Sequence, residues 1–92
     1  MYFIRFNARA NHTKQPSISY AGTAIACWID LPDQSDAEKR ARVVIEYQGW
    51  TIESVDDSYE ITELSYSDDK DGLKYYEQAL IDREVFVFYP WK

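Results

Sequence analysis

Apolar and aromatic residues are gathered in short runs, and four of these runs predict β-strands. They are rich in β-branched and aromatic residues, which favour a pleated, half-buried surface. The four runs cover residues 2–8, 23–29, 50–55 and 85–89. We expect Pro90 to end the last strand, because proline cannot donate to a ladder. A further run at 59–64 predicts a short return strand after a turn at 56–58.

Two other segments place apolar residues at helical spacing. Ser35 and Glu38 form a capping box that predicts the start of the first helix. This helix is expected to reach Gln48, where Gly49 provides a left-handed stop. The acids of Ser67-Asp68-Asp69 suit the positive end of a second helix dipole. The apolar side of that second helix comprises Leu73, Tyr76, Ala79 and Leu80.

The predicted order of elements is β-β-α-β-(β)-α-β, which indicates an α+β fold. From the second strand onward, this order matches the split βαβ of a ferredoxin-like sandwich, here with an added N-terminal strand. Both helices are expected on one face of a mixed sheet, where they would cover the apolar stripes. The length of 92 residues predicts a single domain over residues 1–92.

The first and last predicted strands are apolar on both faces, which such a sandwich does not explain. A sheet with helices on one side exposes its other face to water, and apolar and polar residues then alternate along its strands. We therefore expect a cover for the open face. A homodimer through that face is the simplest cover, and the polar segment 10–20 or a protein partner are the alternatives.

Charge is unevenly distributed along a chain whose net charge is −6. Residues 1–20 hold three basic side chains and no acidic one, whereas residues 53–71 hold eight acidic side chains and one basic. Phosphate would be repelled by the acidic segment, so no nucleic-acid partner is expected. A basic protein surface is the partner that this segment favours.

The compartment prediction depends on the cysteine count and on the absence of long apolar runs. Cys27 is the single cysteine, so no intramolecular disulfide can form. No run approaches the roughly 20 apolar residues of a membrane span, and the opening residues lack a signal-peptide pattern. We expect a cytoplasmic protein that does not bind membranes.

The segment 67–72 resembles part of a calcium loop. Ser67, Asp69 and Asp71 would occupy its first three ligand positions, but Gln78 stands where the bidentate acid belongs. Capping of a helix by these acids is the favoured interpretation, and calcium or magnesium binding remains an alternative. No metal ligand or cofactor is assigned.

His12 and Cys27 are the other candidates for chemistry, as members of a nucleophilic triad that meets in space. Cys27 lies within an apolar strand, where a buried and inert thiol is the ordinary outcome. The acidic residues give no paired-carboxylate pattern, because capping and solvation in turns explain most of them. No catalytic residue is assigned, and the sequence favours a non-enzymatic role.

Several segments resemble a group of short uncharacterised bacterial proteins. The segments are Ala26-Cys27-Trp28-Ile29, the helix that ends in Gly49-Trp50, and residues 75–82 and 84–88. The resemblance covers most of residues 21–91. It implies a bacterial, stand-alone cytoplasmic domain, and it implies no catalytic residue.

Aromatic and acidic side chains are the candidates for binding, because tryptophan and tyrosine dominate interaction hot spots. The candidate binding residues are Trp28, Trp50, Tyr76, Trp91, Asp56, Asp57 and Glu60. The leading hypothesis is a small, acidic, dimeric interaction domain that binds a protein partner. The alternative is a small-molecule-binding domain or cofactor-free enzyme, with an aromatic pocket between sheet and helices lined by Trp28, Tyr76 and His12.

Overall fold

A computed structural model describes residues 1–13 and 19–91 of the chain. The polar segment 10–20, one of the expected covers of the open sheet face, lies only partly within these residues. Lys14 and Pro16 of that segment lie outside them. The strands are β1 (Tyr2–Ala10), β2 (Gly22–Ile29), β3 (Trp50–Glu60) and β4 (Glu84–Trp91). The helices are α1 (Gln34–Tyr47), the short 3₁₀ helix η1 (Glu63–Tyr66) and α2 (Lys70–Asp82).

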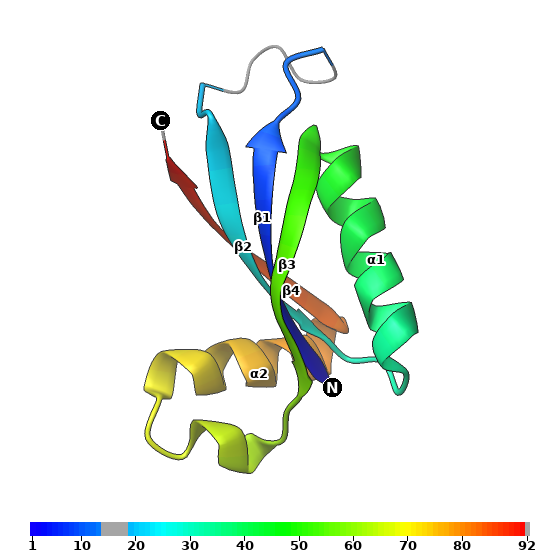
Figure 1. Cartoon of the computed structure of the whole chain (residues 1–92). Helices are drawn as coiled ribbons and strands as arrows, with labels where there is room; N and C mark the ends of the chain where they lie inside the picture. Colours follow the sequence, from blue (N-terminus) through cyan, green and yellow to red (C-terminus); the bar gives the residue numbers. More distant parts are fainter. Residues whose placement is uncertain (14–18, 92) are drawn as a thin grey trace.

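The four strands form one sheet in the order β3-β1-β2-β4, and every neighbouring pair is antiparallel. The α+β class is therefore confirmed, whereas the expectation of a mixed sheet is wrong. Strand β1 joins β3 and β2 at the centre, and β3 and β4 form the two edges (Figure 1). The N-terminal strand is thus central to the sheet.

The two helices lie on opposite faces of the sheet, which corrects the prediction that they share one (Figure 1). Ala37, Ala41 and Ile45 of α1 pack against one set of alternate sheet residues. Ala79 of α2 packs against the other set, which includes Trp28. We name these two sides the α1 face and the α2 face.

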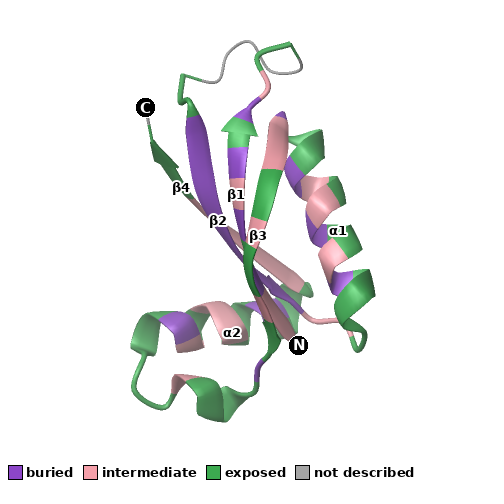
Figure 2. Cartoon of the chain, viewed as in Figure 1, coloured by how far each residue is buried: buried purple, intermediate pink, exposed green. Residues whose placement is uncertain are grey.

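The position of β2 explains why its sequence lacks a polar side. All eight residues of this strand are buried (Figure 2), because it has a strand on either side and a core cluster on each face. The edge strand β4 also contributes to both clusters, through Phe86 and Phe88 on the α1 face and Val85 and Val87 on the α2 face. The apolar pattern of the outer strand therefore reflects two cores within one chain.

Strand β3 is longer than its sequence suggests. It runs for 11 residues through Asp56 and Asp57, so the predicted turn at 56–58 and separate return strand at 59–64 are wrong. Two register shifts in its pairing with β1 accommodate the irregular stretch, and the Asn7 side-chain amide donates a hydrogen bond to Asp56. Acidic side chains are tolerated there because β3 is an edge strand whose polar groups reach water.

Pro90 does not end β4, which continues to Trp91. The Asp30 N–H donates to the Arg83 carbonyl at 2.8 Å, so residues 83, 85, 87, 89 and 91 are those whose backbone groups face β2. Pro90 falls between them, at a position whose missing N–H would have pointed away from the sheet. An edge strand accepts proline in this orientation, because no ladder hydrogen bond is lost.

Helix α1 is capped by Asp33 and not by Ser35, which lies inside the first turn. The Asp33 carboxylate accepts the N–H of Asp36 at 3.0 Å. At the other end, Gly49 has φ 95° and confirms the predicted left-handed stop. For α2 the predicted start is confirmed, since the Asp69 carboxylate accepts the Gly72 N–H at 3.0 Å.

We expect Asp33→Ala to lower the free energy of unfolding by about 1 kcal/mol, the usual cost of a lost N-cap. Ser35→Ala is the matched control and should change it by less than about 0.5 kcal/mol, as at other exposed sites. Urea denaturation followed by circular dichroism measures both. A larger loss of unfolding free energy in Ser35→Ala than in Asp33→Ala would show that Ser35 is the cap.

Candidate functional site

The α2 face carries an open hollow of about 330 Å³, which we name the aromatic trough. It crosses the sheet from edge to edge and is bounded by η1 and the start of α2. Its aromatic lining comprises Phe3, Trp28, Tyr59, Tyr66 and Tyr89. Ala26 contributes the one small side chain, and Arg5 and Asp69 contribute charges of opposite sign.

Strand register explains how the hollow forms. Ala26 of β2 lies opposite Arg5 of β1 and Val87 of β4, and its methyl group leaves space above the centre of the sheet. Two residues along the strand, on the same face, Trp28 lies opposite Phe3 and Val85 and fills the space under α2. The trough is therefore deeper over Ala26 than beside Trp28.

Trp28 forms a fixed wall of the trough, with only 5% of its surface exposed. Its indole N–H donates to the Tyr66 hydroxyl at 2.8 Å. The Phe3 ring meets it edge-on at 5.1 Å between centroids, and the Tyr75 ring lies at 4.8 Å. A wall held on three sides loses little conformational freedom when a ligand binds.

Tyr66 is positioned by the first turn of α2. A Cβ atom on Gly72 would lie 2.5 Å from the Tyr66 ring, so only glycine allows this approach. Partial burial raises the pKa of Tyr66, and the hydrogen bond from Trp28 opposes that change with a smaller effect. Tyr66 is therefore a neutral phenol at physiological pH.

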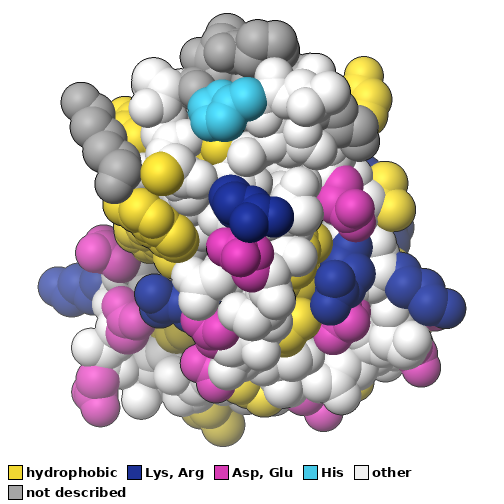
Figure 3. All heavy atoms as spheres, turned by 45° about the horizontal axis from the view of Figure 1, so that its top comes forward, with side chains coloured by type: hydrophobic (Ala, Val, Ile, Leu, Met, Phe, Trp, Pro, Cys, Tyr) yellow, Lys and Arg dark blue, Asp and Glu magenta, His cyan; other side chains and the backbone are white. Residues whose placement is uncertain are grey.

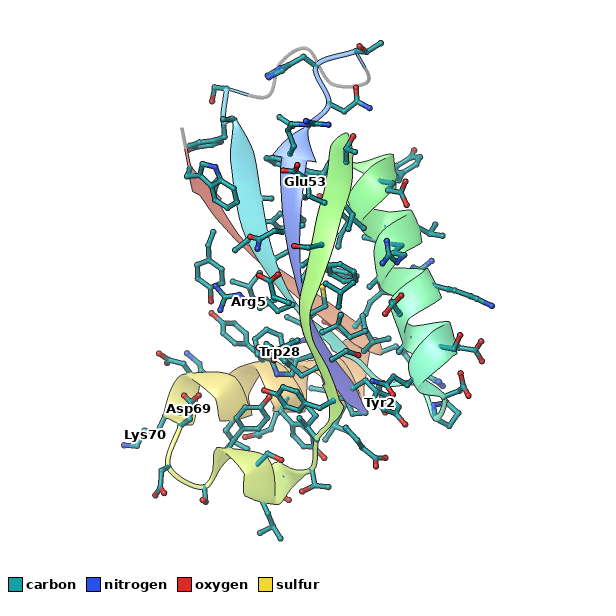
Figure 4. All side chains as sticks on the ribbon, in the orientation of Figure 1. Tyr2, Arg5, Trp28, Glu53, Asp69 and Lys70 are labelled. Atoms are coloured by element: carbon teal, nitrogen blue, oxygen red, sulfur yellow. The ribbon has the colours of Figure 1, made fainter. Side chains whose placement is uncertain are left out.

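Arg5 is the cation of the trough, and it is exposed on the central strand β1. Within residues 1–13 and 19–91, it forms no ion pair or hydrogen bond through its side chain, although Asp57 lies beside it on β3. Figure 4 shows Arg5 and Trp28 on the side of the sheet where α2 lies, with Asp69 at the start of that helix. The Asp69 carboxylate is partly engaged as the helix cap.

The predicted aromatic residues are distributed over both faces, and only Trp28 lines the trough. Tyr76 packs against Tyr66 at 6.0 Å. Trp50 belongs to the α1 face, where its ring lies 6.3 Å from that of Phe88. Trp91 lies over Gly22 and is 44% exposed.

The predicted acidic residues Asp56, Asp57 and Glu60 are all exposed on β3. Asp56 accepts hydrogen bonds from Asn7 and Ser54. Because β3 pairs with β1, Asp57 lies opposite Arg5. Figure 3 shows acidic and basic side chains interspersed on the face that it views.

Cys27 and His12 do not meet. Cys27 is fully buried on the α1 face opposite Ile4, and burial raises the pKa of its thiol far above the ordinary range, with the charge of Glu84 as a smaller cause. His12 is exposed beyond the end of β1, roughly 20 Å or more along the strand direction. A Cys27–His12 pair is therefore excluded.

A second open hollow, of about 230 Å³, lies on α2 and is lined by Asp71, Lys74, Tyr75 and Gln78. Among the residues described, no three histidine, cysteine or acidic side chains are grouped so as to hold a metal ion. No helix of this part of the chain is long and apolar enough to cross a membrane. Comparison with protein-family models, curated proteins and solved structures finds no match to the chain.

Most of the trough residues were missed from the sequence: Phe3, Arg5, Tyr59, Tyr66 and Tyr89. One signal was available, because Arg5 interrupts an otherwise apolar run at a position that faces away from the α1 core. The register that sets Arg5 beside Ala26 and Asp57 is a tertiary property.

Proposed function

We propose that this domain is a protein-interaction module that receives apolar and aromatic side chains of a partner in the aromatic trough. The observation that carries the proposal is an open hollow lined by five aromatic rings, beside an arginine without an ion-pair partner in the described chain. Tyrosine, tryptophan and arginine are the residues that dominate interaction hot spots. An open hollow suits a partner surface better than a small ligand, which is usually enclosed on most sides.

The acidic side chains of β3 support a basic partner. Asp57 and Glu60 are exposed on the edge of the sheet, close to Tyr59 of the trough. Carboxylates at the rim of an interface raise the association rate of a basic protein and contribute less to the final affinity. We therefore assign anchoring to the trough and steering to β3.

The experiment selects ligands from a displayed library of random peptides. Selected peptides should combine aromatic with basic residues. Their affinity, measured by fluorescence anisotropy, should fall at least about tenfold in Tyr59→Ala and in Tyr89→Ala, which remove exposed rings of the trough. The double variant Asp57→Lys/Glu60→Lys should slow association and weaken its salt dependence.

Tyr47→Ala is the matched control, because Tyr47 is a tyrosine on α1 with 85% of its surface exposed. It should leave the affinity unchanged. Peptides that bind Tyr59→Ala and Tyr89→Ala as tightly as the original protein would refute the assignment of the trough. A library that yields no binder would count against the interaction function itself.

The guanidinium of Arg5, which has no ion-pair partner among the described residues, favours a second candidate, a small aromatic anion. Its carboxylate would bind Arg5 and its ring would pack on Tyr89 or Tyr59. A thermal-shift series with benzoate and naphthoate tests this, because a bound ligand raises the melting temperature by mass action. The shift should disappear in Arg5→Gln.

A further inference from the structure

The outer edge of β4 has unpaired backbone groups. Within the described chain β4 pairs only with β2, through the groups of residues 83, 85, 87, 89 and 91. The carbonyls of Phe86, Phe88 and Pro90 and the N–H groups of Phe86 and Phe88 therefore point away from the sheet. An edge of this kind is a template for another strand.

The opposite edge, β3, is protected in the ways that prevent strand addition. It carries several acidic side chains and two register shifts, and α1 lies beside it. The Gln34 side-chain amide also donates to the Ser58 carbonyl at 3.2 Å. These are the features by which proteins avoid pairing at an edge.

β4 lacks the acidic side chains and the register shifts, although α2 lies beside it as α1 lies beside β3. Residues 85–91 contain no charged side chain. Glu84, at the start of the strand, is neutralised by Arg40 at 2.8 Å. Pro90 is the one residue that limits pairing, and it lies near the end of the strand.

We propose that two copies of this chain pair antiparallel along β4 and form a continuous eight-stranded sheet. The two-fold axis passes beside Val87. In that register Phe86 faces Phe88 of the partner subunit, and each of these two residues donates its N–H to the carbonyl of the other. Pro90 lies opposite Glu84 of the partner subunit, so its carbonyl accepts the Glu84 N–H and its missing N–H is not needed.

A second copy is the occupant that this edge favours, because residues 85–91 carry no charge and can pair with themselves without like-charge repulsion. The same pairing along β3 would set acid against acid. This edge-to-edge dimer replaces the sequence-based expectation of a dimer through the sheet face. It does not depend on the proposed function, and in this register Tyr89 of the trough lies opposite Val85 of the partner subunit.

Charge placed at the two-fold axis tests the pairing. In this register Val87 faces Val87 of the partner subunit, in a close pair without hydrogen bonds. Sedimentation of the intact chain should show a dimer that dissociates on dilution. Val87→Lys and Val87→Glu should each sediment as monomers at concentrations where the original protein is dimeric, and an equimolar mixture of the two should recover the dimer.

Glu53→Lys, on the exposed edge β3, is the control and should leave the dimer unchanged. Circular dichroism shows whether the Val87 variants fold. Amide hydrogen exchange of the original protein needs no variant: Phe86 and Phe88 should be protected at high concentration and exchange faster on dilution. A strictly monomeric protein, a dimer that survives in both single variants, or fast exchange at these two amides at all concentrations would overturn the proposal.

Discussion

Phe6→Ala is expected to lower the free energy of unfolding by about 3–5 kcal/mol, the range for a large core side chain truncated to alanine. Phe6 is fully buried on the central strand β1, and the Arg42 guanidinium lies 5.6 Å above its ring. The sheet and α1 both pack on this ring, so neither can close the cavity without moving the other. A small domain has a total stability of only about 5–15 kcal/mol, so the loss is severe.

Urea denaturation followed by tryptophan fluorescence measures the loss. Val43→Ala is the control on α1, because 61% of the Val43 surface is exposed and the change should stay within about 0.5 kcal/mol. The loss of unfolding free energy in Phe6→Leu should lie between the losses in Phe6→Ala and Val43→Ala. A cost below about 1 kcal/mol for Phe6→Ala would show that the α1 core is not packed around this ring.

Cys27 is expected to make the domain less stable in alkali. Burial raises the pKa of its thiol in the folded state, whereas the unfolded thiol has a pKa of about 8.5. Above that pH the unfolded chain loses a proton that the folded chain keeps. The free energy of unfolding should therefore be unaffected by this group below about pH 8 and fall by up to about 1.4 kcal/mol per pH unit above pH 9.

Urea denaturation at a series of pH values measures the slope, and Cys27→Ala should remove it between about pH 8.5 and pH 10. Tyr66, whose pKa is also raised, adds a similar dependence only above about pH 10. The same burial predicts that a thiol reagent modifies Cys27 only when the chain unfolds, about 10³-fold or more slowly than in urea. Rapid modification of the folded protein would contradict the buried position.

Features set by local chemistry were predicted well from the sequence. Gly49 stops α1 because its left-handed conformation is a property of that residue, and Asp69 caps α2 because its acceptor lies three residues ahead of the Gly72 N–H. At the start of α1 the local pattern was misleading, because the capping box of Ser35 and Glu38 predicted Ser35 as the cap, whereas Asp33 caps the helix.

Features set by neighbouring elements were predicted poorly. Asp56 and Asp57 favour turns in isolation, but on an edge strand with register shifts they reach water without one. The placement of α2 on its own face depends on whether Trp28 points toward α1 or away from it, and no local signal specifies that. The trough combines residues from four strands and η1, so its lining residues can be identified only when the strand order and register are known.

The complete burial of β2 has a consequence for how the domain unfolds. Successive residues of this strand belong to different cores, Cys27 to the one under α1 and Trp28 to the one under α2. If either helix detached, the strand would expose half of its side chains while the other half remained packed. Both cores therefore share one backbone, and the domain should lose them in a single cooperative transition with coincident fluorescence and circular dichroism curves.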